Sequence, residues 1–241
     1  MLRLFVPRGQ VTAGRVRIAG VELRHLRTLR LAPGAALTVF DEHGDEHEVR
    51  LERVTASDAE GVIVATRRPA RESSLELVLA PALLKGARMD LVVEKATELG
   101  VHRIAPLVCR HGVAREGRTE RWQRIALAAA KQCGRTAVPA IDAPVPLGVL
   151  VRQPWPGLRL LAWEEEHERS FAVLPETAAA VVVVVGPEGG LAADEVADAA
   201  AHGFVTLTLA PRILRAETAA LAVAALCQHR WGDLSSARRL R

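Results

Sequence analysis

Hydrophobic positions follow different periods in the two parts of the chain. Over residues 36–54, two β-rich runs flank an acidic turn with Gly44, which predicts a β-hairpin, and residues 61–68 add another strand. Residues 21–31 follow helical spacing, with arginines outward and leucines inward: Leu23, Leu26, Leu29 and, less regularly, Leu31. We therefore expect a small, mostly β domain with one helix over residues 1–70, followed by a polar linker.

Alternation of apolar strand-like and helix-like segments begins at residue 75. Glycines or polar residues separate the segments, and Gly100 and Gly134 end two of the helical patterns. The expected strands are 75–83, 103–109, 158–164, 180–186 and 205–210, and the expected helices are 87–100, 119–134, 192–203 and 216–231. This order is typical of an α/β domain with a mostly parallel sheet covered on both faces, which we expect over residues 71–241.

Two unusual loops follow successive strands of the expected sheet. Five valines, 181–185, lead directly into the sequence Gly-Pro-Glu-Gly-Gly at 186–190, and a second loop occupies residues 209–219. Glycines allow close approach of a backbone to a ligand, and ligands bind at the carboxyl ends of strands in open α/β sheets. One such loop is also explained by a tight turn, but two together indicate a pocket. The GxGxxG and GxxxxGK[ST] patterns are both absent.

The charge balance makes nucleic acid a candidate partner. The 241-residue chain has a net charge of +4, and residues 110–135 hold seven Arg or Lys against two Glu. A solvated helix face is the alternative interpretation of that run. A second stripe of arginines lies on the amino-terminal helix. Expected RNA contacts are Arg24, Arg27, Arg30, Arg110, Arg115 and Arg135.

Other classes of site are weakly supported. Three scattered cysteines without CxxC spacing favour a reducing compartment over a disulfide framework or zinc site, and we expect no metal. His43 and His47 are explained by the acidic hairpin turn. Cys133 is more typical of packing than of a nucleophile. Since we find neither a signal-peptide pattern nor an apolar run long enough for a membrane span, we expect a cytoplasmic protein without membrane contact.

Four ordered blocks resemble one known family. These are 85–101 (KGARMDLVVEKATELGV), 122–135 (WQRIALAAAKQCGR), 186–191 (GPEGGL) and 209–221 (LAPRILRAETAAL). They resemble the bacterial enzymes that methylate N3 of a uridine in small-subunit ribosomal RNA, the RsmE family of SPOUT methyltransferases. The amino-terminal sequences HLRTLRL and VFDEHGDE resemble the family's PUA-like RNA-binding domain. One difference is Ala210, where the family usually has glycine.

The resemblance implies a fold, a cofactor and partners. It implies a carboxyl-terminal trefoil knot, S-adenosylmethionine held by the knot loops, a homodimer, and small-subunit RNA as substrate within assembled 30S particles. The residues expected to contact the cofactor are Ala162, Trp163, Gly186, Glu188, Gly189, Gly190, Leu207, Leu209, Ala210, Ile213 and Leu214. Some of these leucines are equally typical of the core.

Methylation at N3 requires the uracil imide to lose its proton. Arg212 and Arg215 have the chemistry to stabilise the resulting anion, and Glu217 to accept the proton or orient an arginine. A cap and a local ion pair at a helix start are the alternative interpretation of Arg215 and Glu217. Two other functions stay open: a SPOUT methyltransferase acting on another base or a ribose 2'-hydroxyl, and a non-catalytic RNA-binding assembly factor.

Overall fold

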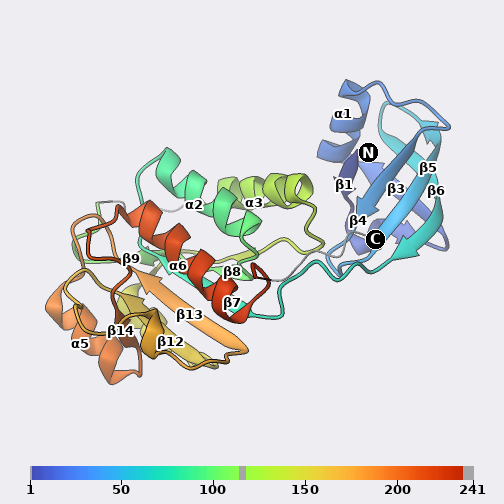
Figure 1. The fold of residues 1–241 in the computed structure, drawn as a ribbon. Coiled ribbons are helices and arrows are strands. Elements are labelled where there is room, and N and C mark those ends of the chain that lie inside the picture. Colours follow the sequence, from blue (N-terminus) through green and yellow to red (C-terminus); the bar gives the residue numbers. More distant parts are fainter. Residues whose placement is uncertain (1, 114–117, 236–241) are drawn as a thin grey trace. The chain divides into compact units, whose positions relative to one another are not determined.

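The chain forms two compact units. The computed structural model describes residues 2–113 and 118–235 (Figure 1). One unit comprises Met1–Glu72 together with Ala130–Val138, and the other Ser73–Ala129 together with Pro139–Arg241. The first division falls close to the expected domain boundary at residue 70. Residues 130–138 differ from the expectation, because their contacts are with the amino-terminal unit although they lie far along the chain.

A six-stranded sheet forms the first unit, in the order β1-β4-β5-β6-β3-β2. β1 runs parallel to β4, and the remaining pairs are antiparallel. The predicted hairpin is confirmed as β4 paired with β5, and the helix as α1. The elements are β1 (Arg3–Phe5), η1 (Arg8–Gln10), β2 (Val11–Thr12), β3 (Arg15–Ala19), α1 (Gly20–Thr28), β4 (Ala36–Phe40), β5 (Glu46–Val54) and β6 (Asp58–Arg67).

Apolar side chains between α1 and this sheet form the core of the first unit. Leu23 and Leu26 of α1 are buried there as expected. The expectation for Leu29 is wrong, since its side chain is 51% exposed. The helix ends at Thr28, so the helical period no longer applies one residue later. Leu31 packs partly against the same core.

Residues 130–138 join the first unit through ionic contacts. Lys131 Nζ lies 2.8 Å from the Glu22 carboxylate on α1. The guanidinium of Arg135 donates to Glu72 Oε2 at 2.8 Å, and the backbone amides of Thr136 and Ala137 donate to Glu72 Oε1. Burial raises the pKa of the Glu72 carboxyl, but the charge of Arg135 and these hydrogen bonds outweigh it and lower the pKa overall.

The second unit is built on a six-stranded sheet, in the order β10-β8-β7-β13-β12-β14. Every strand pair in it is parallel, which confirms the predicted sheet type. Its elements are β7 (Glu76–Pro81), α2 (Ala87–Glu98), β8 (Arg103–Ile104), β9 (Leu107–Val108), α3 (Thr119–Cys133), β10 (Ala140–Ile141), β11 (Val145–Pro146), α4 (Leu147–Val151), β12 (Leu158–Ala162), η2 (Phe171–Val173), β13 (Ala180–Val185), α5 (Ala193–Ala201), β14 (Val205–Leu207) and α6 (Ala216–Trp231).

Helices on both faces explain the run of valines in β13. Val182 and Val184 pack in a core cluster with residues of α4 and α5, while α6, with α2 beside it, packs against β7 and β13 (Figure 1). Consecutive side chains of a strand point to opposite faces, so a strand covered on both sides is apolar at every position. All five valines are therefore buried.

The segment expected as one strand at 103–109 is two short strands. Pro106 lies between β8 and β9 and has no N–H to donate to a ladder. β8 stays in the main sheet, whereas β9 pairs with β11 in a separate two-stranded sheet. Within the described part of the chain, no helix combines the length and apolar character that crossing a membrane requires.

Candidate functional site

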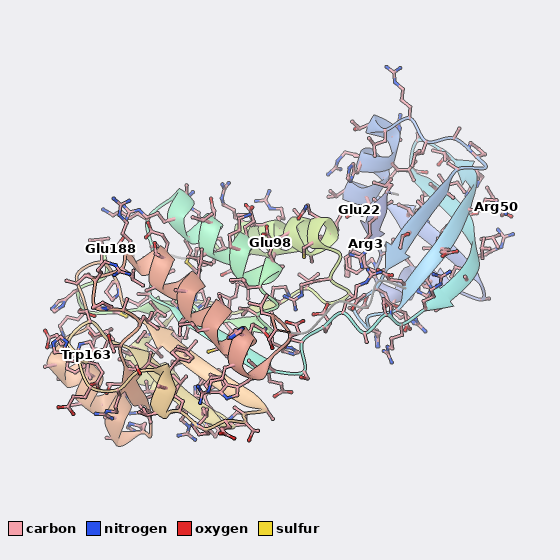
Figure 2. All side chains as sticks on the ribbon, in the orientation of Figure 1. Arg3, Glu22, Arg50, Glu98, Trp163 and Glu188 are labelled. Carbon is pink, nitrogen blue, oxygen red and sulfur yellow. The ribbon has the colours of Figure 1, made fainter. Side chains whose placement is uncertain are left out.

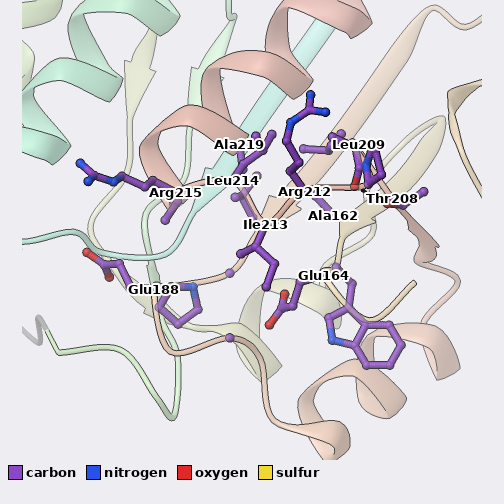
Figure 3. Close-up of a pocket in the computed structure, with 18 of the residues that line it drawn as sticks. Ala162, Glu164, Glu188, Thr208, Leu209, Arg212, Ile213, Leu214, Arg215 and Ala219 are labelled. Atoms are coloured by element: carbon purple, nitrogen blue, oxygen red, sulfur yellow. Dashed lines mark hydrogen bonds between the residues drawn. The ribbon is translucent and has the colours of Figure 1, made fainter. Parts of the chain in front are cut away.

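The loops that follow β12, β13 and β14 enclose a cavity of about 1060 Å³ (Figure 3). Both polar and apolar residues line it. The two loops singled out in the sequence, 186–190 and 209–219, both contribute. The lining residues are Ala162, Trp163, Glu164, His167, Ser170, Val185, Gly186, Pro187, Glu188, Gly189, Gly190, Thr208, Leu209, Ala210, Pro211, Arg212, Ile213, Leu214, Arg215, Ala216 and Ala219.

Strand order brings these loops together. β12 lies between β13 and β14, and Ala162 at its carboxyl end is in register with Val185 and with Leu207. Beyond the strand ends, the Trp163 amide donates to Leu207 O at 3.1 Å, and the Thr208 amide donates to Arg169 O at 2.7 Å. The chain segments therefore leave the sheet side by side, and the space between them is the cavity.

The loop after β13 depends on its glycines in different ways. Gly190 has a φ of +74°, and its amide donates to Pro187 O at 3.0 Å, which closes a tight turn. A Cβ on Gly186 would lie 2.9 Å from Leu191 Cγ, and one on Gly189 would lie 3.0 Å from His111 Cβ. Gly186 and Gly189 thus give room to the protein's own side chains, while they also line the cavity.

Glu188 of this loop is held from outside the cavity by α2. Arg88, in the first turn of α2, donates a hydrogen bond to the Glu188 carboxylate. Both side chains are partly exposed, so the pair is accessible to solvent; Figure 2 labels Glu188 at this position. This ion pair fixes one side of the loop and partly neutralises the carboxylate.

The loop after β14 supplies the two arginines that line the cavity. Arg212 and Arg215 both line the cavity, and Arg215 is the N-cap residue of α6 (Figure 3). Ala216 and Ala219 add the first turns of that helix to the wall. Ile213 is 87% exposed, although it is a large apolar residue. An exposed isoleucine at the rim of a cavity is a surface that a ligand can cover.

Glu166 fixes the segment that follows β12. Its Oε2 accepts a 2.6 Å hydrogen bond from Thr206 Oγ1 of β14, and its Oε1 accepts from the amides of Glu168 and Arg169. The hydrogen bond from Thr206, together with these amides, lowers the pKa of Glu166 to about 2 against the opposing effect of burial. The loop that carries Trp163 and Glu164 is therefore anchored to the neighbouring strand.

Ten of the eleven residues expected to contact the cofactor line the cavity; the exception is Leu207. Leu207 is fully buried and packs in the core, so its contact with the cofactor stays a prediction that the cavity does not support. Arg212 and Arg215 also lie at the cavity, but Glu217 is not among the residues that line it. The Oε2 atom of Glu217 is buried and has no hydrogen-bond partner among the described residues.

Nine cavity residues were not among the site residues predicted from the sequence: Glu164, His167, Ser170, Val185, Pro187, Thr208, Pro211, Ala216 and Ala219. Pro187, Pro211, Ala216 and Ala219 belong to the two loops already singled out, and Val185 and Thr208 directly precede these loops. Glu164 and His167 lie in the segment that follows β12. Ala162 and Trp163 at the end of this strand were already expected at the site, so the next few residues could have been included for the same reason. The Trp163 indole Nε1 is buried without a hydrogen-bond partner among the described residues, so this wall of the cavity contains an unused donor.

The expected RNA-contact residues have different surroundings. Arg24, Arg27 and Arg30 are exposed. Arg110 is exposed too, with its guanidinium 2.5 Å from Asp194, and Arg115 lies outside the described residues. Arg135 differs from the others, because it is 6% exposed and its guanidinium donates to Glu72. The structure therefore shows a structural role for Arg135, and its contact with RNA stays a prediction.

The second unit belongs to the α/β proteins that bind a ligand at the carboxyl ends of parallel strands. A family model for the RNA methyltransferase domain matches residues 71–228. The chain belongs to this RNA methyltransferase family. Over the residues that the structure describes, no group of three or more His, Cys, Asp or Glu is arranged to hold a metal ion.

Relatives and solved structures agree with this assignment. The ribosomal RNA small subunit methyltransferase E of a Synechocystis species is 32% identical over 90% of this chain and 74% of its own length. A crystal structure of the Neisseria gonorrhoeae enzyme of the same name, bound to S-adenosyl methionine, is 33% identical with a TM-score of 0.90, covering 97% of this chain and 99% of that one. A methyltransferase from Legionella pneumophila, solved with bound cofactor SAM, is 31% identical with a TM-score of 0.89 and the same coverage of both chains.

Proposed function

We propose that the protein methylates N3 of a uridine in 16S ribosomal RNA, with S-adenosylmethionine as methyl donor. The observation that carries the proposal is the cavity between the loops after β13 and β14, in a chain whose relatives are named as small-subunit methyltransferases. Two neighbours of similar fold hold S-adenosylmethionine, which supports the same donor here. Such a protein would act in the cytoplasm, where ribosomes assemble.

The residues of the cavity fit this donor. A volume of about 1060 Å³ accommodates a molecule of that size. Leu209, Leu214 and Ala219 offer apolar surface for an adenine. The methyl of Ala210 lines the cavity where the family usually has glycine, and at this volume it narrows the cavity without closing it. We therefore assign donor binding to these two loops.

The proposed reaction needs positive charge near the uracil, and the loop after β14 supplies it. S-adenosylmethionine, when bound, supplies an electrophilic methyl group. Uracil N3 must lose its proton as it gains the methyl, and the negative charge spreads to both carbonyl oxygens. Arg212 and Arg215 line the cavity and carry the fixed donors that stabilise such charge. Glu217 does not line the cavity, and its buried Oε2 has no hydrogen-bond partner among the described residues, so we keep both of its expected roles, proton acceptor and orienting group for an arginine, as proposals.

The amino-terminal unit and the oligomeric state complete the proposal. We assign residues 1–70 to a PUA-like RNA-binding domain and residues 71–241 to a SPOUT domain with a trefoil knot. We also propose a homodimer that acts on assembled 30S particles. Arg24, Arg27, Arg30 and Arg110 are exposed and suited to phosphate contact, and Arg115 remains in the proposed set.

Incubation of the protein with isotope-labelled S-adenosylmethionine and unmodified small subunits tests the function. We expect one labelled N3-methyluridine in 16S RNA, identified by mass spectrometry of nuclease fragments. Arg215→Ala should slow methyl transfer far more than it weakens donor binding. A labelled ribose 2'-hydroxyl or another labelled base would replace the N3 assignment with a different methyltransferase reaction, and absence of donor binding by calorimetry would indicate a non-catalytic assembly factor.

The preference for assembled particles has its own test. Aromatic residues make up only 3% of the chain and tyrosine is absent, so base stacking offers little for reading a single strand. Recognition should therefore depend on RNA shape and backbone contacts. A short naked RNA with the target uridine should be a poor substrate beside 30S subunits, and equal rates on both would contradict this part of the proposal.

A further inference from the structure

We infer that Glu164 binds a cationic group of the methyl donor. The inference rests on the proposed function, because it concerns the ligand of the same cavity. Glu164 was not among the residues singled out in the sequence. It lies two residues after the end of β12, in the segment that also carries Trp163, and it lines the cavity.

The carboxylate of Glu164 lies beside Gly190 of the loop that follows β13. A Cβ built on Gly190 would lie 2.2 Å from Glu164 Oε1, so the carboxylate occupies the space that a side chain at position 190 would fill. Figure 3 shows the carboxylate directed into the space between the loops. Because Gly190 has no side chain, the exposed carboxylate of Glu164 can lie directly beside the backbone of this loop, where it lines the cavity.

The two carboxylates of the cavity differ in their partners. Glu188 is bound by Arg88, so its charge is already balanced. For Glu164, the described residues supply no hydrogen bond or ion pair to its carboxylate. Arg212 and Arg215, the cations of the cavity, come from the loop after β14. The cavity therefore has a negative group on the β12 side in addition to the positive groups on the β14 side.

The methyl donor carries two cationic groups that this carboxylate could bind. One is the sulfonium, which becomes a neutral thioether when the methyl leaves, and the other is the α-ammonium group, which does not change. A carboxylate beside the sulfonium would favour donor over product and so assist product release, because the attraction is lost together with the charge. A carboxylate beside the ammonium would bind donor and product equally.

Calorimetric titration of three ligands into wild-type protein and Glu164→Gln tests the inference. The ligands are S-adenosylmethionine, S-adenosylhomocysteine, which lacks the sulfonium charge, and 5'-methylthioadenosine, which lacks both cationic groups. Glutamine keeps the size of the side chain and removes its charge. We expect Glu164→Gln to weaken binding of the donor about tenfold or more and to leave binding of methylthioadenosine unchanged. A loss confined to the donor assigns Glu164 to the sulfonium, and an equal loss for donor and product assigns it to the ammonium.

Glu165→Gln is the matched control, since Glu165 is the next residue, is exposed and does not line the cavity. It should bind all three ligands as the wild type does. Unchanged donor affinity in Glu164→Gln overturns the inference and leaves the proposed function intact. Equal losses of affinity for all three ligands also overturn it, because they indicate a change in the structure of the cavity. Equal losses in the Glu165 variant overturn it as well, because they indicate an effect of the overall negative charge of this loop. Wild-type protein that binds none of the ligands contradicts the proposed function itself.

Discussion

Gly190 serves two purposes, and one substitution can separate them. Its φ of +74° is unfavourable for any residue with a Cβ, and its missing side chain leaves room for Glu164. We expect Gly190→Ala to cost about 1 to 2 kcal/mol of stability through backbone strain. It should also weaken donor binding at least tenfold, because the new methyl displaces the Glu164 carboxylate. Urea unfolding and calorimetry measure the two effects.

Gly86 offers the control for that substitution. Its φ is +59°, but a Cβ there would meet no atom within 4 Å. Gly86→Ala should therefore lose stability through backbone strain alone and keep its affinity for the donor. If both variants bind the donor as the wild type does, the approach of Glu164 to Gly190 has no role in binding.

At the scale of the element, Glu195 caps α5. Its Oε2 accepts a hydrogen bond from the Ala192 amide at 3.0 Å, and its Oε1 accepts from the Arg110 amide at 2.9 Å. Ala192 stands where a Ser or Thr cap is usual, so Glu195 provides the side-chain acceptor at this helix start. We expect Glu195→Ala to cost about 1 to 3 kcal/mol of unfolding free energy, because two backbone amides lose their partner.

Asp194→Ala is the comparison for Glu195→Ala in urea unfolding. Asp194 also lies in the first turn of α5, but its ion pair with Arg110 is exposed at both ends. Such a pair contributes less than about 1 kcal/mol. Equal costs for the two variants would show that Glu195 acts through general charge at the helix start rather than through its hydrogen bonds.

Glu166 makes the attachment of the β12 loop to β14 dependent on pH. Its folded-state pKa of about 2 is below the ordinary carboxyl value of 4.5, so its contribution to stability is fully present above about pH 4.5. The contribution is lost as pH falls from about 4.5 toward 2. We expect Glu166→Gln to be less stable than wild type by about 1 to 3 kcal/mol at pH 7, with the difference falling steadily below about pH 4.5 and disappearing only below about pH 2. Chemical unfolding of both proteins at several pH values measures this difference, and a constant difference would contradict the assignment.

Local sequence pattern predicted the elements well, because burial on both faces leaves a direct trace in residues such as Val181–Val185. The cavity loops were found for a similar reason, since Gly186 and Gly190 interrupt the pattern at strand ends. The hydrophobic pattern could not show which distant residues contact one another. Arg135 resembles any exposed arginine in sequence, and only its distant contact with Glu72 makes it a buried one. Likewise the sequence pattern around Leu207 is the same whether its side chain contacts a ligand or the core. The pattern around Glu164 is that of any carboxylate in a polar loop.

At the scale of the whole molecule, the contacts of residues 130–138 make the amino-terminal unit depend on a distant part of the chain. Arg135 is the central residue of this contact: its side chain is 7% exposed, and its guanidinium donates to Glu72 through both Nε and a terminal nitrogen. Removal of one partner of a buried ion pair is destabilising. Loss of this pair should therefore lower the stability of the first unit without a direct effect on the cavity of the second.

Glu72→Gln tests that dependence, with Glu48→Gln as its control. Glu72→Gln removes the carboxylate charge beside the buried guanidinium of Arg135, and we expect it to cost about 3 kcal/mol of unfolding free energy. Glu48 pairs with Arg67 at the surface of the same unit, so Glu48→Gln should cost less than about 1 kcal/mol. Urea unfolding followed by circular dichroism measures both, and donor binding at 25 °C should be unchanged in each variant because the cavity lies in the second unit. If the two variants are equally stable, residues 130–138 do not hold the first unit together through Glu72. If Glu72→Gln alone loses donor binding, the two units unfold together. The assumption that each unit has its own stability is then wrong.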